Sequence, residues 1–194
     1  MSENTEPTNA DIEAQMRAWI SSFVVGMNLC PFARQPVEGG RVKIVVSEAR
    51  DNEALLEALQ SQLEWLDAQP PASTETTLIV IPHMLGDFLD FNDFLDLADA
   101  LLEEFGWVGQ FQFATFHPNY QFAGTLPGDA ENFTNRAPWP TLQLLREDSL
   151  EAVLANYPDP EQIPERNIDA MEELGSAKLA DLLQECRDKS SVRS

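Results

Sequence analysis

The chain has 194 residues and a formal net charge of −21, with 33 Asp and Glu against 12 Lys and Arg. This length fits one compact domain, and a hydrophobic share of 43% is enough to build a sizeable core. Because so acidic a chain repels polyanions over most of its surface, nucleic acid and anionic membranes are excluded as expected partners.

The N-terminus and the cysteine content predict a cytoplasmic protein. Residues 1–13 contain neither a basic segment nor an apolar one, so they do not form a secretory signal. No apolar run approaches the ~20 residues that a bilayer crossing requires. Cys30 and Cys186 are the only cysteines, and two such distant thiols make no disulfide framework, which fits a reducing compartment.

Hydrophobic spacing and turn residues predict an alternation of helices and strands. Apolar residues recur every three or four positions between Ile12 and Met27, the pattern of an amphipathic helix that Pro31 brings to an end. Short β-branched or apolar runs such as TTLIVI predict buried strands. In chain order we expect a helix at 11–29, a strand at 42–46, a helix at 52–66, a strand at 76–81, a helix at 90–105, a strand at 111–116, a helix at 142–157 and two short helices at 167–174 and 178–186.

This order of elements predicts an α/β fold. We expect a compact single domain with a small, mainly parallel sheet of about three strands and flanking helices. The alternative is an α+β arrangement with an antiparallel strand. The domain is expected to span residues 10–188, between a disordered tail at 1–9 and a C-terminal tail at 189–194.

The long segment that begins at His117 is the leading candidate for a functional site. Irregular segments of this length are uncommon in compact domains and are usually functional or disordered. Aromatic residues such as Tyr120, Phe133 and Trp139 are too numerous here for a disordered segment. We therefore predict an ordered loop that walls a ligand site.

His117 is the first candidate catalytic residue. It follows the strand at 111–116, and ligands of open α/β sheets collect outside the carboxyl ends of strands. His83 follows the strand at 76–81 and shares that edge if the two strands are parallel. Imidazole titrates near neutral pH and can transfer protons. The alternative is that each histidine is a hydrogen-bonded part of the wall.

Cys30, Arg136 and Arg146 are the other candidates from the residues alone. Cys30 is either a nucleophile or a small buried hydrophobic residue. A guanidinium matches a carboxylate or phosphate with two parallel hydrogen bonds, so both arginines are candidate ligands of an anion. The alternative is pairing with the chain's own acids. No metal site is expected, because the Cys and His residues show no paired ligand spacing.

Three blocks of the chain resemble a bacterial domain family of unknown function. The blocks are NLCPFA at 28–33, FHPNYQFAGT at 116–125 and NFTNRAPWPTLQLLRE at 132–147. The resemblance implies a small bacterial protein and brings no known activity or cofactor. A histidine often stands where this chain has Gln143, and glutamine cannot shuttle protons at neutral pH. The family's recurrent polar positions fall here on Cys30, His117, Asn119, Tyr120, Asn135, Arg136 and Arg146.

We therefore predict a small cytoplasmic enzyme or ligand-binding protein, with a pocket for a small anionic molecule formed by the segment from His117 to Arg146. The alternative is an acidic, non-catalytic interaction or regulatory protein. The sequence names no cofactor and leaves the oligomeric state open. The predicted roles are catalysis for His117 and Cys30, and substrate binding for Asn119, Tyr120, Asn135, Arg136 and Arg146.

Overall fold

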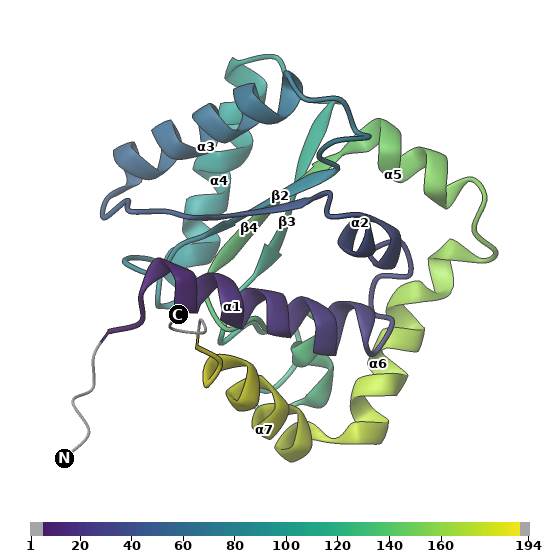
Figure 1. Ribbon diagram of the computed structural model, residues 1–194. Coiled ribbons are helices and arrows are strands. Elements are labelled where there is room, and N and C mark those ends of the chain that lie inside the picture. The colour runs from purple at the N-terminus through teal and green to yellow at the C-terminus, as the bar shows by residue number, and fades with distance from the viewer. Residues whose placement is uncertain (1–5, 191–194) are drawn as a thin grey trace.

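Four strands form one mixed sheet in the computed structural model of the chain, which describes residues 6–190 (Figure 1). The strands are arranged in the order β1 (Val42–Val46), β2 (Thr76–Val80), β4 (Thr141–Arg146) and β3 (Phe111–Phe116). β1 and β2 are parallel, whereas β4 runs antiparallel to both of its neighbours. β1, β2 and β3 therefore point the same way, and their carboxyl ends lie at the same end of the sheet.

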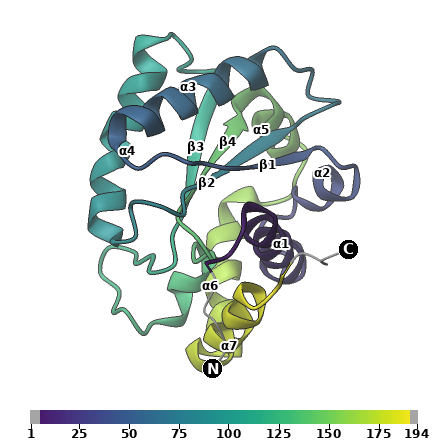
Figure 2. The same cartoon turned by 60° about the vertical axis from the view of Figure 1, so that its left-hand side comes forward.

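α3 (Asn52–Asp67) and α4 (Phe88–Glu104) cover one face of the sheet (Figures 1 and 2). Leucines at three- and four-residue spacing along α3 are fully buried against inward side chains of β2 and β4, among them Ile79 and Leu142. Each helix begins after an aspartate whose carboxylate accepts backbone N–H bonds from the first turn. This face holds the larger apolar core.

The second face carries α1 (Asn9–Trp19) and its π-helical continuation η1 (Ile20–Val25), and α7 (Ser176–Arg187) packs against α1. Their buried side chains form a separate cluster with the residues of β2 that alternate with the first core, such as Leu78. Trp19 packs edge to face on a phenylalanine of β3, with ring centroids 5.0 Å apart. The sheet thus separates two apolar cores.

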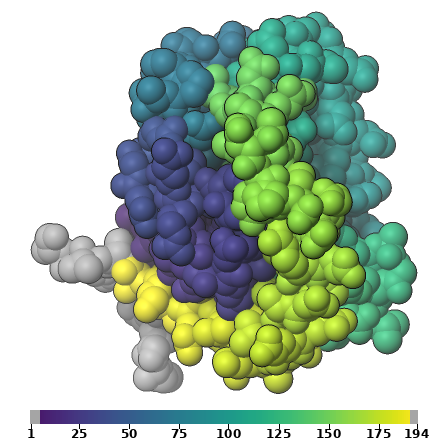
Figure 3. Space-filling view, turned by 90° about the vertical axis from the view of Figure 1, so that its right-hand side faces the viewer, coloured from purple at the N-terminus to yellow at the C-terminus, as the bar shows by residue number. Residues whose placement is uncertain are grey.

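Short helical segments border the remainder of the second face. They are α2 (Arg34–Glu38), α5 (Glu147–Leu154), the 3₁₀ turn η3 (Pro160–Gln162) and α6 (Ile163–Leu174). Figure 3 shows the chain around α2, in purple, side by side with α5 and α6, in green. An edge-to-face ring contact between Phe32 and Tyr157 joins the two segments, with centroids 5.1 Å apart.

The helix predicted at 142–157 is wrong: its first part is strand β4, and only its second part is the helix α5. Leu142 and Leu144 are buried against α3 and α4, while Gln143 between them faces the other side, which is the alternation of a strand. Leu, Gln and Arg favour helix locally. Pairing with two neighbouring strands outweighs that preference, since propensities differ by less than about 1 kcal/mol per residue.

The mainly parallel, three-stranded sheet is corrected for the same reason. β4 inserts between β2 and β3, so the sheet has four strands and only one parallel pair. The α/β class and the compact domain are confirmed. The alternative with an antiparallel strand was closer to the observed pairing.

The other predicted helices are present with shifted ends. The first begins at Asn9, where Thr8 caps it in a reciprocal pair with Asp11, and its α-helical part ends at Trp19. Of the two predicted tails, residues 1–5 and 191–194 lie outside the described residues. Within 6–190, no helix combines the length and the hydropathy that a bilayer crossing requires.

Candidate functional site

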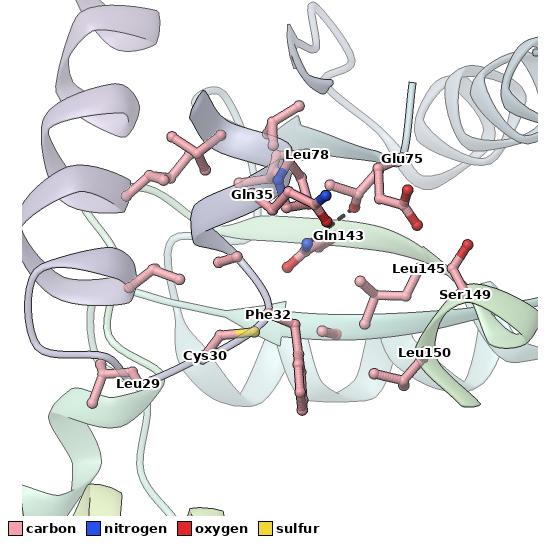
Figure 4. A pocket seen from close by; sticks show the side chains of 18 of the residues that line it. Leu29, Cys30, Phe32, Gln35, Glu75, Leu78, Gln143, Leu145, Ser149 and Leu150 are labelled. Carbon is pink, nitrogen blue, oxygen red and sulfur yellow. Dashed lines mark hydrogen bonds between the residues drawn. The ribbon is translucent and has the colours of Figure 1, made fainter. Parts of the chain in front are cut away.

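A cavity of about 540 Å³ opens on the second face of the sheet (Figure 4). Inward residues of β2, β3 and β4 form its floor, among them Leu78, Ala114 and Gln143. The α2 and α5 segments, which meet in Figure 3, form its outer wall with side chains such as Phe32 and Leu150. A mostly apolar cavity of this size is typical of small-molecule sites.

Gln143 is the central polar group on the floor of this cavity. Its Nε2 donates to Thr76 Oγ1 at 3.0 Å, and Thr76 Oγ1 donates to the Leu144 carbonyl at 2.6 Å. The hydroxyl has one proton, which it gives to the carbonyl, so it must accept from the amide nitrogen. The orientation of Gln143 is thereby fixed, and its Oε1 is the end left for a ligand.

Two asparagines repeat this arrangement. Asn135 Nδ2 donates to the Thr115 carbonyl at 3.1 Å, and Asn167 Nδ2 donates to the Leu29 carbonyl at 2.8 Å. A carbonyl can only accept, so each amide must direct its nitrogen toward the backbone. Both asparagines line the same cavity as Gln143.

The three amide oxygens are therefore acceptors without donors. Within residues 6–190 none of them accepts a hydrogen bond, and none is among the side-chain atoms that are both buried and unpaired. Solvent therefore reaches all three. The polar lining of the cavity is biased toward accepting hydrogen bonds.

Arg41 and Glu75 form an ion pair in the cavity wall. Arg41 Nη1 lies 2.8 Å from Glu75 Oε2, and both side chains are about one fifth exposed. The same nitrogen also approaches the Pro71 carbonyl at 3.3 Å. The pair brings no net charge to the cavity.

Cys30 lines the cavity between η1 and α2, and Figure 4 shows its sulfur beside Phe32. Burial raises the pKa of the Cys30 thiol, an effect that the nearby backbone N–H groups of Phe32 and Ala33 only partly offset. The thiol is therefore protonated at neutral pH. The raised pKa of the Cys30 thiol thus favours the buried-wall alternative over the nucleophile.

We expect Cys30 to react with iodoacetamide at pH 7 more slowly than free glutathione does, because only the thiolate is nucleophilic. The measurement is mass spectrometry of alkylated peptides in a Cys186→Ser variant, which isolates the signal. Reaction at the glutathione rate or faster would show that the thiol is activated. Cys30→Ala serves as the blank.

His117 lies at the carboxyl end of β3, away from the cavity, and its side chain is fully buried. Its Nδ1 accepts the Asn119 backbone N–H at 3.0 Å, which places the ring proton on Nε2, 3.0 Å from the Leu85 carbonyl. The rings of Phe88 and Phe91 pack on it, with centroids 5.3 and 5.2 Å away. Both ring nitrogens are hydrogen-bonded to backbone groups, as expected for a histidine that is a structural part of the wall.

Arg136 stabilises its own loop through hydrogen bonds to backbone carbonyls. Its Nε donates to the Tyr120 carbonyl at 3.1 Å and its Nη2 to the Pro127 carbonyl at 2.7 Å, while the guanidinium carbon lies 4.6 Å from the Phe133 ring centroid. The Arg136 carbonyl in turn accepts the Trp19 indole N–H at 2.8 Å. The loop is thus packed against α1.

Arg146 points to the opposite face of the sheet. Its Nη2 donates to the carbonyls of Leu66, Gln69 and Thr74 at 2.6, 2.7 and 3.3 Å, at and beyond the C-terminal end of α3. Its guanidinium carbon also lies 5.7 Å from the Phe111 ring centroid. A cation here complements the negative end of the helix dipole.

The structure brings only some of the predicted site residues together. Cys30 and Asn135 line the cavity, and so does Arg146, although its guanidinium is bonded elsewhere. The cavity lining does not include His117 or the residues of the loop tip, Asn119, Tyr120 and Arg136. Asn119 is exposed, and the Tyr120 ring packs between Phe88 and Phe122.

Several cavity residues were missed by sequence reasoning. They are Arg41, Glu75, Thr76 and Asn167. The sequence did contain a signal for one further cavity residue, Gln143. If TLQLLR is interpreted as a strand, Gln143 lies on the face opposite to that of its two leucine neighbours. For the asparagine near the start of α6 no signal existed, because its neighbour Leu29 lies 138 positions away.

Comparison with known proteins supports the resemblance drawn from the three sequence blocks. Residues 11–181 match the model of a family described as protein of unknown function (DUF1415). No curated protein and no solved structure matches the chain. The match covers most of the described fold, from the first turns of α1 into α7, and so the chain belongs to the DUF1415 family.

Proposed function

We propose that this protein binds a small, largely apolar molecule that carries hydrogen-bond donors, in the cavity between the sheet and the α2 and α5 segments. The observation that carries this proposal is the set of three amide oxygens on Asn135, Gln143 and Asn167, each held in place by its own nitrogen and none supplied with a donor. Oriented acceptors in an apolar cavity select for N–H and O–H groups.

The charges around the cavity argue against an anion there. Arg136 and Arg146 use their guanidinium groups on backbone carbonyls, and Arg41 is paired with Glu75. The chain carries 33 acids, which favour a neutral or cationic ligand over an anion. The anionic ligand expected from the sequence therefore has no unoccupied cation in this cavity.

The chemistry of the lining supports binding more than acid–base catalysis. Gln143 cannot exchange protons at neutral pH, burial raises the pKa of the Cys30 thiol, and His117 lies outside the cavity. A cytoplasmic location, without nucleic acid or membrane as a partner, remains part of the proposal. Free thiols at Cys30 and Cys186 are consistent with that location.

Thermal unfolding against two ligand panels tests the proposal. One panel contains amphiphilic amines, alcohols and amides, and the other contains carboxylates and phosphates of the same carbon skeletons. We expect members of the first panel to raise Tm, since a ligand at 100 times its Kd stabilises the native state by about 2.7 kcal/mol. A response confined to the second panel would contradict the predicted chemistry.

Filling the cavity supplies the matched variant. Ala114→Met places a long side chain on the cavity floor, and we expect it to weaken any panel ligand at least tenfold. Gln112→Met introduces the same residue two positions earlier on the same face of β3, at an exposed site outside the lining, and should leave binding unchanged. Equal effects of both variants would locate the ligand elsewhere.

A further inference from the structure

A second cavity, of about 630 Å³, lies at the carboxyl ends of β2 and β3. The turn that follows β2 forms one side, and Pro118, Pro138 and Pro140 contribute to another. Arg187, at the end of α7, lines it as well. This is the end of the sheet where ligands of α/β proteins collect.

Arg187 has no partner among residues 6–190. It takes part in no hydrogen bond or ion pair with them, and its Nε is shielded from solvent and unpaired. Burial, with no compensating acid, lowers the pKa of its guanidinium. With 33 acidic residues in the chain, an unpaired cation is unusual. Other arginines pair with a glutamate, namely Arg17, Arg34 and Arg41. A partly desolvated and unpaired cation costs folding free energy unless something else supplies the counter-charge.

Residues with unpaired backbone donors line the same cavity. The N–H groups of His83, Met84 and Gly86 donate to no acceptor within the described chain, although all three residues line the cavity. Leu85, between them, adopts the left-handed conformation, with φ +57°. Successive N–H groups in a turn of this kind form concave anion-binding sites. The proline walls have no N–H of their own, and the Trp139 indole N–H already donates to Gln15 Oε1 at 2.7 Å. The donors in the lining without a described acceptor therefore include those of this turn, Gln15 Nε2 and Arg187.

The nearby carboxylates are already engaged. Glu48 Oε2 lies 3.4 Å from His83 Nε2, and Glu48 Oε1 accepts a hydrogen bond from Asn9 Nδ2 at 2.6 Å. Asp87 caps α4 by accepting two backbone N–H bonds from Leu89 and Asp90. Neither acid is within ion-pair distance of Arg187. The cavity lining therefore contains one unpaired cation and several residues whose backbone N–H groups are unpaired.

From this juxtaposition we propose that the second cavity is a binding site for a small oxyanion, a carboxylate or a phosphate, held by the Arg187 guanidinium and the backbone N–H groups of the 83–86 turn. The site is separate from the cavity assigned above. It would bind an anion, for which the first cavity has no unpaired cation.

Calorimetric titration of the full chain with inorganic phosphate and, separately, with acetate tests the site, at constant ionic strength set with chloride. We expect saturable binding of at least one of the two with a stoichiometry of one. The stronger of the two identifies whether phosphate or carboxylate chemistry is preferred. Absence of saturable binding by both would overturn the proposal.

Variants at two arginines locate the site. Arg187→Met should weaken anion binding at least tenfold and should raise Tm without ligand, because it removes an unpaired, partly desolvated charge. Arg187→Lys keeps the charge but loses the planar fork, and should bind with intermediate affinity. Arg34→Gln, on an exposed arginine far along the chain, changes the net charge equally and should leave binding unchanged. Unchanged binding by Arg187→Met, or equal loss in Arg34→Gln, would overturn the assignment.

Discussion

Replacement of Arg146 by methionine is expected to lower the free energy of unfolding by about 2 to 4 kcal/mol, since hydrogen bonds to a charged group contribute about 1.5 to 3 kcal/mol each. Methionine keeps much of the packing volume but leaves the Gln69 and Thr74 carbonyls without the donor that joins them to β4. Leu66 loses least, because its carbonyl also accepts the Gln69 N–H. Relief of the unpaired Arg146 Nε offsets part of the loss. Urea unfolding of the ligand-free protein measures the difference.

Two further variants serve as controls for Arg146→Met. Arg34→Met removes an arginine whose side chain is 61% exposed, and should change stability by less than about 0.5 kcal/mol. Arg146→Lys keeps the charge near the end of α3 but not the fork, and should lie between wild type and methionine. If Arg146→Met were as neutral as Arg34→Met, the residue would not be structural, and a role in ligand binding would regain support.

Replacement of His117 by phenylalanine is expected to cost about 2 to 4 kcal/mol at pH 7.5, because a buried polar group that loses its partner costs about 1 to 3 kcal/mol. Phenylalanine preserves the aromatic contacts with Phe88 and Phe91 but offers nothing to the Leu85 carbonyl or the Asn119 N–H. The measurement is again urea unfolding. A variant as stable as wild type would contradict the hydrogen-bonded wall role.

The cost of His117→Phe should shrink as the pH falls. Burial lowers the pKa of His117 in the folded protein, whereas in the unfolded chain it stays near its ordinary ~6.5. The unfolded state then binds the proton more readily, so wild type keeps this stability above pH ~6.5 and loses up to about 1.4 kcal/mol per pH unit below it, down to the folded pKa. The phenylalanine variant has no such loss. Comparison between pH 8 and pH 5.5 avoids most carboxylate titration, and a cost independent of pH would refute the lowered pKa.

The sequence predicted the α/β class because the strongest local patterns were also the buried ones. The leucines of α3 and the TTLIVI run of β2 are covered on every side, so their spacing was set by the core that they build. The pattern in β4 was too short to decide between helix and strand. Six residues with two buried leucines fit either periodicity until the neighbouring strands are known.

The predicted site met the same limit. The residues of the 117–146 segment were chosen as one group because they are close in the chain, but β4 and its loop direct them to different places. Asn135 faces the first cavity, His117 is enclosed near the second, and Arg146 reaches behind the sheet to α3. Proximity in sequence therefore identified a structurally important loop without identifying which of its side chains share a cavity.

The sequence by itself determined the alternation of helices and strands, the acidic net charge, the family and the ordered loop after β3. These properties depend on residue type and on neighbours a few positions away. Only the tertiary structure decided which polar groups remain unpaired. Whether the Gln143 amide or the Arg187 guanidinium has a partner depends on groups from distant segments, such as Thr76, 67 positions before Gln143. Hydrogen-bond pairing across such separations follows from strand order and register, which local patterns do not encode.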